Sequence, residues 1–214
     1  MTFRELTRQE QTLVNRALDL WGVFDALKGK TFLVDSSSKV YLMSPELASV
    51  VIKVQPDVAG LAIGSLGKKK QFTPTLAGAN LFARAGGKGK KCYVRVGENA
   101  EKLVLYGRDV MGDSVIEASP ELGENELVII LNARGEAIGI GRTRFSGKSI
   151  LQKGRVAITT LADAGSYLRD EANNNADSSS GGGGGGEAER RAKMTRGRGT
   201  TAAAQQPKRR GVPG

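Results

Sequence analysis

The alternation of apolar and polar positions near the N-terminus predicts a helix followed by a hairpin. In LTRQEQTLVNRALDLW, Thr7 and Glu10 stand at capping-box spacing, and the apolar residues after them recur at the intervals of one helix face. TFLV and KVYLM are short apolar runs separated by a polar turn, which is the pattern of two antiparallel strands. The helix face comprises Leu13, Val14, Ala17, Leu18 and Trp21, and the turn comprises Asp35, Ser36, Ser37 and Ser38.

The following segments, up to about residue 90, combine short helices with a strand. The Ser44-Pro45 pair is typical of an N-cap and first turn, and it predicts a short helix through Leu47, Val50 and Val51. GLAIGSLGKKKQFTPTL is typical of a strand that runs into a lysine-bearing loop, and LAGANLF of a short helix or turn. We place a domain boundary in the glycine- and lysine-rich GGKGKK, residues 86–91.

After this boundary the apolar runs become short and closely spaced. CYVRV, KLVLYG, SVIEAS, ELVIILN, AIGIGRTRF and RVAIT all read as strands, and Gly and Asn turns separate several of them. This pattern is typical of a small, mainly-β barrel. A last helical piece, DAGSYLRDE, closes the folded part near residue 172.

Residues 173–214 have the composition of a disordered tail. The segment runs from NNNADSSS through six glycines to a basic end, and it contains almost no large apolar residue with which to build a core. From Asp177 onward it holds eight Lys or Arg and three Asp or Glu, a net charge of +5 out of the +10 of the whole chain. The basic charge is therefore shared equally between the folded part and the tail.

This positive charge favours a polyanionic partner, either nucleic acid or an anionic membrane. No apolar run approaches the roughly 18 residues of a spanning helix. The N-terminal MTFRELTRQEQ is charged where a signal peptide would be apolar, so we expect a soluble intracellular protein with no membrane partner. The single cysteine, Cys92, excludes an internal disulfide and agrees with a reducing compartment, and its place in KCYVRV predicts a buried strand position.

The chain has no histidine, and this absence narrows the possible chemistry. It excludes Ser-His and Cys-His nucleophiles and an imidazole base, and one cysteine cannot complete an ordinary zinc site. Two apparent nucleotide motifs also fail. Ser146-Gly147-Lys148-Ser149 resembles the end of a P-loop, but Arg142 stands where its first glycine is required. The Gly139-Ile140-Gly141 segment continues to Arg144 where a dinucleotide fingerprint requires glycine, and it does not open a helix. We therefore expect no enzyme activity, cofactor, metal or small-molecule substrate.

The stretch from Leu105 to Phe145 resembles the PUA domain, which is named for pseudouridine synthases and archaeosine transglycosylases. The matching features occur in order: an apolar segment into a Gly-x-x-Val turn at Gly107, then Gly-Glu-x-x-Leu-Val-Ile-Ile, then a Gly-x-Ala-Ile-Gly-x-Gly hairpin. With LTRQEQ, KVYLM, GSLGKKKQFT and ADAGSYLRDE included, residues 5 to 172 resemble the Nip-seven family of 60S-subunit biogenesis factors. The tail has no counterpart in that resemblance.

The resemblance implies an α+β protein with three parts. Residues 1–90 would form an N-terminal α/β domain with a mainly antiparallel sheet and flanking helices, residues 91–172 a PUA-type β-barrel, and residues 173–214 the disordered basic tail. It further implies a non-catalytic factor in large-subunit assembly and pre-rRNA processing. Such a factor resides in the nucleolus and nucleus, is a monomer outside the particle, and has pre-ribosomal RNA and pre-60S proteins as partners.

PUA domains grip RNA beside their glycine turn, with backbone amides on phosphates and basic side chains nearby. By resemblance this assigns Gly107 and Arg108, together with Arg142, Arg144, Lys148 and Lys153. In a strand, Arg142 and Arg144 would share a face about 7 Å apart, close to the spacing of successive phosphates. Further candidates for phosphate contact are Lys68, Lys69 and Lys70, the interdomain Lys88, Lys90 and Lys91, and Arg196 and Arg198 in the tail.

Several alternatives stay open at this point. Each basic group could be an ordinary solvated charge, Tyr106 and Phe145 could be core or stacking residues, and the tail could be an RNA-binding arm or an extension without function. The chain could also be a PUA-containing translation factor of the small subunit, or the RNA-targeting part of an RNA-modification enzyme.

Overall fold

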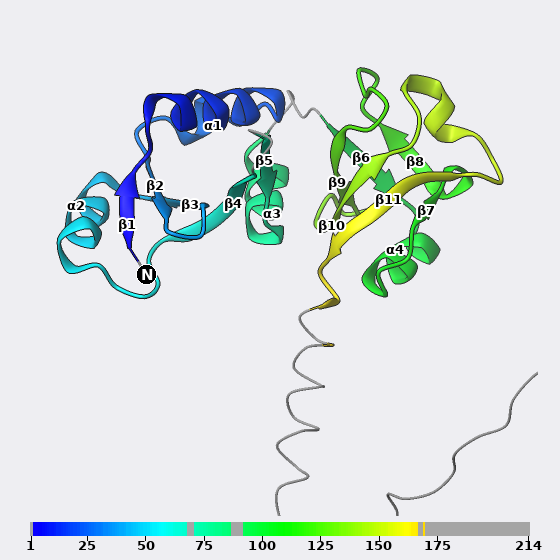
Figure 1. Cartoon of the computed structure of the whole chain (residues 1–214). Coiled ribbons are helices and arrows are strands. Elements are labelled where there is room, and N and C mark those ends of the chain that lie inside the picture. The colour runs from blue at the N-terminus through cyan, green and yellow to red at the C-terminus, as the bar shows by residue number, and fades with distance from the viewer. Residues whose placement is uncertain (1, 68–70, 87–91, 167–168, 170–214) are drawn as a thin grey trace, which may run out of the picture.

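The computed structural model describes residues 2–67, 71–86, 92–166 and 169 of the 214-residue chain. The described residues form an N-terminal antiparallel sheet with helices on both faces and a C-terminal, nearly closed barrel (Figure 1). This is the expected α+β architecture. The expectations for residues 68–70, for most of the closing helical piece and for the tail lie outside the described residues, as does most of the proposed domain boundary.

The N-terminal sheet has its five strands in chain order, and all neighbouring strands are antiparallel. Alternate residues of β3 point to opposite faces: Val40 belongs to the main core with α1 and α3, and Tyr41 belongs to a smaller cluster under α2. The sheet therefore lies between two layers of helix. Its elements are β1 (Phe3–Glu5), α1 (Arg8–Leu20), η1 (Asp25–Leu27), β2 (Thr31–Asp35), β3 (Lys39–Met43), α2 (Pro45–Val54), β4 (Leu61–Gly67), β5 (Gln71–Pro74) and α3 (Leu76–Ala85).

The predicted first helix, hairpin and two short helices are confirmed, but the structure has two further strands. β1 and β5 were not expected, because each has few apolar residues and obtains its place from pairing with a neighbour. In α2 the buried residues are Ala48 and Val51, whereas Leu47 and Val50 are exposed. Of the three apolar residues that the sequence pattern named in this helix, only Val51 is therefore in the core.

The N-terminus of α1 is fixed by the predicted capping box and by an added arginine. The Thr7 hydroxyl accepts from the Glu10 amide, and the Glu10 carboxylate accepts from the Thr7 amide at 2.8 Å. Arg4 donates to both Glu10 oxygens at 2.7 Å. These contacts, the arginine hydrogen bond above all, lower the pKa of Glu10 to about 2. Glu10 thus joins β1 to the start of α1.

We predict that Glu10→Gln lowers the free energy of unfolding by about 1 kcal/mol at pH 7, which is typical of a lost cap and a partly exposed ion pair. The pKa of Glu10 is lowered on folding, so its contribution is complete above the ordinary value of 4.5 and is lost as the pH falls toward 2. Urea denaturation at pH 7, 4 and 2.5 should show the difference between variant and wild type shrinking with acid. Glu5→Gln is the control, and a difference independent of pH would contradict the prediction.

The β2–β3 hairpin is held by a buried carboxylate. Asp35 accepts hydrogen bonds from the Ser37 amide, the Lys39 amide and the Tyr41 hydroxyl. Burial alone would raise the pKa of Asp35, but these hydrogen bonds together outweigh it and leave the pKa below its ordinary value. Asp35 is therefore a structural residue of the turn.

The C-terminal part is a six-stranded, nearly closed sheet in the order β7-β11-β10-β9-β6-β8. Its pairs are antiparallel except β6 with β9, which is parallel because a long connection through α4 and β8 separates these two strands in the chain. Its elements are β6 (Tyr93–Val96), α4 (Glu98–Leu105), β7 (Val110–Met111), η3 (Gly112–Ser114), β8 (Val115–Ala118), β9 (Leu127–Leu131), β10 (Ala137–Thr143), η4 (Gly147–Leu151) and β11 (Val156–Asp163).

Five of the six predicted barrel strands are confirmed, and the sixth, KLVLYG, is instead the second half of α4. The apolar run Leu103-Val104-Leu105 suggested a strand. In the structure only Val104 of that run is fully buried, together with Ala100 one helical turn earlier, and Leu103 is exposed. Buried positions four residues apart are typical of a helix. The segment therefore forms a helix, although its run of three apolar residues suggested a strand.

Helix α3 connects the two parts of the fold. It packs against β4 of its own sheet and against β10 and β9 of the barrel. Phe82 and Ala83 of α3 lie in the same buried cluster as Ile130 and Ile140 of the barrel. The apolar core is thus continuous through α3.

Candidate nucleic-acid interface

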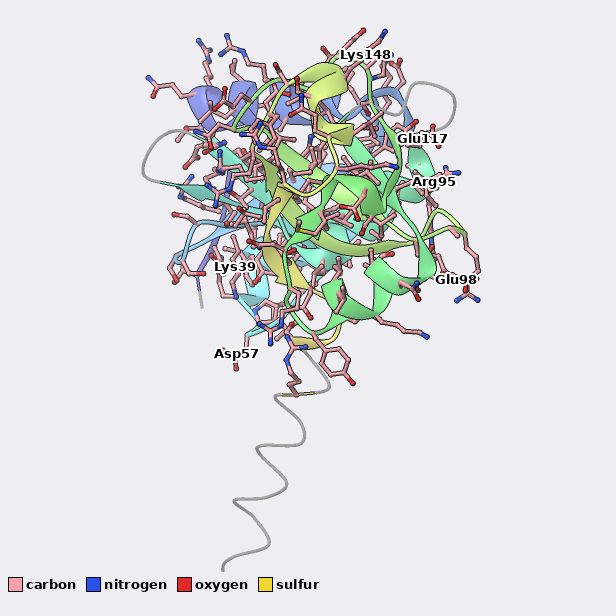
Figure 2. The ribbon with its side chains drawn as sticks, turned by 90° about the vertical axis from the view of Figure 1, so that its right-hand side faces the viewer. Lys39, Asp57, Arg95, Glu98, Glu117 and Lys148 are labelled. Atoms are coloured by element: carbon pink, nitrogen blue, oxygen red, sulfur yellow. The ribbon has the colours of Figure 1, made fainter. Side chains whose placement is uncertain are left out.

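A basic segment runs from the end of β10 to the start of β11. From Arg142 to Arg155 it contains five Lys or Arg and no Asp or Glu. We call this segment the basic loop. Its side chains at Arg144, Lys148, Lys153 and Arg155 are exposed, and Arg142 is partly buried. Figure 2 shows Lys148 at the top of the barrel and Glu98, the first residue of α4, on its lower side.

The second half of the basic loop is held against the barrel at two points, Ile150 and the backbone from Gln152 to Arg155. Ile150, the apolar residue of η4, is fully buried in the main core. The Gly112 amide donates to the Arg155 carbonyl at 2.9 Å, and a Cβ at Gly112 would lie 2.1 Å from the Gln152 carbonyl oxygen. Close backbone contact of this kind leaves the loop little freedom. The basic side chains therefore project from a fixed support.

Arg142 and Arg144 differ from the expected pair on one strand face. β10 ends at Thr143, so Arg144 lies just beyond the strand. The Arg142 guanidinium donates to the Asn125 carbonyl at 2.6 Å, whereas the Arg144 side chain makes no hydrogen bond to the described residues. Arg144 faces an open groove of about 560 Å³ that it shares with Asn125 and Arg155, among others. Arg144 is thus available to a ligand, and Arg142 is partly engaged.

Arg155 is a candidate that sequence reasoning missed. Its guanidinium lies 4.3 Å from the centre of the Phe145 ring and donates to Gln152 at 3.1 Å. Phe145 is partly buried against the main core, and Arg155, which lies over its ring, is exposed. The guanidinium of Arg155 therefore offers a plane on which a base could stack, because arginine planes stack on bases as aromatic rings do. In the sequence, Arg155 is only a basic residue directly before a strand, and nothing there indicates its contact with Phe145.

An acidic loop borders the basic one. The Gly147 amide donates to the Leu122 carbonyl at 2.9 Å, which places η4 beside the segment 121–126 with its three glutamates. Glu126 accepts from the Gly123 amide, and Glu124 lines the same groove as Arg144. A polyanion bound to the basic loop is therefore repelled from this side, which restricts its path across the barrel.

The glycine turn at Gly107 lies on the other side of β11. Arg142 pairs with Thr159 across the ladder, while the next residue, Thr160, donates its amide to Asp109 and its hydroxyl to the Arg108 carbonyl. The turn and the end of β10 are therefore neighbours of the same strand, with β11 between them. The exposed Arg108 side chain is the turn's cationic group.

The backbone amides of this turn are already used. Gly107 has a φ of +72° and donates its amide to the Val104 carbonyl at 2.8 Å, and the Arg108 amide donates to the Leu103 carbonyl at 3.0 Å. Both bonds close the C-terminal end of α4, as in helices that end on a left-handed glycine. The expectation that these amides hold phosphate is therefore not supported, and the Arg108 side chain is left as the group that can. Tyr106 is 74% exposed, which excludes a core role.

The end of the folded segment closes over this turn. Arg169 forms an ion pair with Asp163 at 2.9 Å and also donates to the Leu105 carbonyl, the last residue of α4. Asp163 is buried, so the pair is shielded from solvent on one side. The turn at Gly107 is consequently positioned by the residues that follow β11.

The remaining candidates lie outside the described residues. They are Lys68, Lys69, Lys70, Lys88, Lys90, Lys91, Arg196 and Arg198. Within the described residues there is no group of three or more His, Cys, Asp or Glu that could hold a metal ion. None of the helices described is long and apolar enough to cross a membrane.

Comparison with known proteins defines the class to which this fold belongs. Residues 92–172 match the model of the UPF0113 PUA domain, and residues 3–76 match that of the NIP7/UPF0113 pre-PUA domain. The barrel is thus a PUA domain. A UPF0113 protein of Archaeoglobus fulgidus is 35% identical over 175 residues, which cover 80% of this chain and 97% of the relative. The chain therefore belongs to the NIP7/UPF0113 family.

Other relatives agree with this fold. A UPF0113 protein of Aeropyrum pernix is 34% identical over 111 residues, covering 52% of this chain and 56% of that protein. A hypothetical protein of Pyrococcus horikoshii has a similar structure, with a TM-score of 0.59 and 16% identity over 79% of this chain and 98% of the other. A PUA-domain protein of Thermoplasma acidophilum has a TM-score of 0.56 and 13% identity over 79% of this chain and 99% of its own.

Proposed function

We propose that the protein binds RNA through the basic loop of its PUA domain and acts by binding in the assembly of the large ribosomal subunit. The observation that carries RNA binding is the basic loop itself. It holds five cationic side chains and no carboxylate over fourteen residues, fixed on the barrel by Ile150 and Gly112. Such an arrangement suits a phosphate backbone, which supplies a row of negative charges at regular spacing.

The contacts available to RNA are of two kinds. Arg144, Lys148 and Lys153 offer charge to phosphates without reading sequence. The guanidinium of Arg155 and the exposed ring of Tyr106 offer planes on which unpaired bases can stack. The favoured substrate class is therefore single-stranded or looped RNA, with the strand passing from the basic loop across β11 toward Arg108.

The specific role in 60S assembly is supported by the resemblance of both domains to the Nip-seven assembly factors. By that role the partners are pre-ribosomal RNA and proteins of the pre-60S particle, and the protein is a monomer outside the particle. In a cell with a nucleus this role belongs to the nucleolus. Because the chain has no histidine, and its exposed basic groups suit binding, we propose that it has no catalytic step of its own.

Sedimentation of particles tests the proposed subunit. The tagged full-length protein is expected to cosediment with precursors of the large subunit and to crosslink to precursor rRNA. A variant with Arg144→Gln and Lys148→Gln should be depleted from those fractions, and a variant with Lys30→Gln and Lys39→Gln, two exposed lysines of the N-terminal part, should not. A peak with the small subunit would instead indicate a translation factor, and methyl transfer or pseudouridine formation by the purified protein would indicate an enzyme.

A further inference from the structure

Helix α2 exposes an apolar surface that RNA binding does not explain. Leu47, Val50 and Val54 are 42%, 53% and 69% exposed, and they stand at positions i, i+3 and i+7, on one side of the helix. We call these three residues the α2 stripe. Val58, four residues beyond its end, is 80% exposed. Single exposed apolar residues are ordinary, but an aligned set of this kind marks an interaction surface.

The α2 stripe is exposed because only a narrow side of α2 packs against the sheet. Only Ala48 and Val51 are buried, against a small cluster of Phe3, Leu33, Tyr41 and Met43. The other edge of this layer is already closed, because the Gln55 side chain accepts from the Phe3 amide at 2.6 Å and donates to the Phe3 carbonyl at 3.0 Å. A ligand at this face therefore packs on the α2 stripe and does not extend the sheet at Phe3.

We propose that the α2 stripe binds an amphipathic helix of a different protein. The chain's own tail does not supply the apolar side chains, because Met194 and Val212 are the only large apolar residues from 173 to 214. A second copy of the chain is disfavoured by area. Three or four half-exposed side chains bury a few hundred Å², against about 800 Å² per partner in a stable interface. A helix on a partner held in place by other contacts suits a surface of this size.

Charges beside the stripe define the orientation of that helix. Glu46 and Lys53 are exposed and, being seven residues apart, lie on the same side of α2 next to the stripe. An antiparallel partner with acidic residues near its N-terminal end and basic residues near its C-terminal end pairs with Lys53 and Glu46 respectively. The same distribution of charge stabilises the partner's own helix dipole. The surface thus favours one direction of binding.

The position of α2 makes the two binding functions compatible. Figure 1 shows α2 at the end of the N-terminal part farthest from the barrel. The partner helix and RNA on the basic loop therefore occupy opposite ends of the molecule. The inference goes beyond RNA binding and does not depend on it, since it rests on the N-terminal part alone.

Photocrosslinking tests the proposal. Val58 is replaced by benzoylphenylalanine in the full-length chain, particles containing it are irradiated, and the crosslinked peptide is mapped. We expect a segment of another protein with apolar residues at i, i+3 and i+7. A synthetic peptide of that segment should bind the purified full-length protein in fluorescence anisotropy, and Val50→Glu with Val54→Glu should weaken binding at least about tenfold.

Matched measurements keep the result interpretable. Gln9→Glu with Thr12→Glu adds the same two negative charges on exposed positions of α1, which packs on the opposite face of the sheet from α2. This control should leave peptide binding unchanged, and circular dichroism should show all variants folded. Binding of single-stranded RNA should be equal in wild type and in the Val50→Glu, Val54→Glu variant, which separates this proposal from the proposed function. Crosslinks to the tail, to a second copy or to RNA, the absence of any crosslink, or an equal effect of the α1 control would overturn it.

Discussion

Replacing Arg144 and Lys148 by glutamine is expected to weaken binding of single-stranded RNA about 25-fold at 0.1 M salt. Each phosphate contact contributes a slope of about 0.7 in the dependence of log affinity on log salt, which corresponds to about fivefold per contact at 0.1 M relative to 1 M. Two lost contacts therefore reduce the slope by about 1.4. Neither side chain makes a hydrogen bond to the described residues, so stability should be unaffected.

Fluorescence anisotropy with an unstructured RNA at four salt concentrations measures both quantities. The matched control is Lys39→Gln with Lys53→Gln, which removes the same charge from the N-terminal part; Figure 2 shows Lys39 well below Lys148. The control lowers the net charge equally, so it accounts for long-range attraction. If the two double variants lost affinity and slope to the same extent, the basic loop would have no special place in RNA binding.

Much of the fold was accessible from the sequence because its elements carry their own signals. The capping box at Thr7 and Glu10, the polar turn at Asp35 and the short apolar runs in ELVIILN and AIGIGRTRF each gave the right element. The errors occur where tertiary contacts decide. The run ending at Leu105 forms a helix because Ala100 and Val104 meet the barrel, and β1 and β5 exist because a neighbouring strand pairs with them.

The candidate interface was predictable in composition but not in geometry. The resemblance to PUA domains pointed to Arg142, Arg144, Lys148 and Lys153, and their basic character is visible in the sequence itself. The stacking of Arg155 on Phe145, ten residues away, depends on how the loop folds back. The use of the Gly107 and Arg108 amides to close α4 likewise depends on that segment being a helix, which the sequence pattern did not indicate.

The α2 stripe shows a third kind of limit. An apolar periodicity predicts that a helix has an apolar face, but it does not show whether other elements of the same protein cover that face. The sequence pattern named Leu47, Val50 and Val51 together as the apolar residues of this helix. Only the placement of Ala48 and Val51 against the sheet shows that Leu47 and Val50 face outward. This exposure is the evidence for a binding surface.

Gly112→Ala is expected to destabilise the protein by about 3 kcal/mol and to weaken RNA binding at the same time. The new Cβ would lie 2.1 Å from the Gln152 carbonyl oxygen and 2.8 Å from that of Ile150, both backbone atoms that no rotamer change can move. Overpacking against a fixed backbone costs about 1 to 3 kcal/mol or more. Relief requires moving the basic loop away from η3, which also weakens the bond from the Gly112 amide to Arg155.

Calorimetry should show a melting temperature lowered by roughly 6 to 12 °C, the shift that about 3 kcal/mol produces in a chain of this size. Gly67→Ala is the control, because its Cβ would meet only the Gln71 carbonyl oxygen at 3.5 Å, an ordinary contact. RNA affinity measured well below the melting temperature separates the two effects. A stable variant would show that the loop relaxes without cost. A destabilised variant with unchanged affinity would show that the fixed position of Lys148 and Arg155 is not needed for binding, leaving charge alone as the determinant.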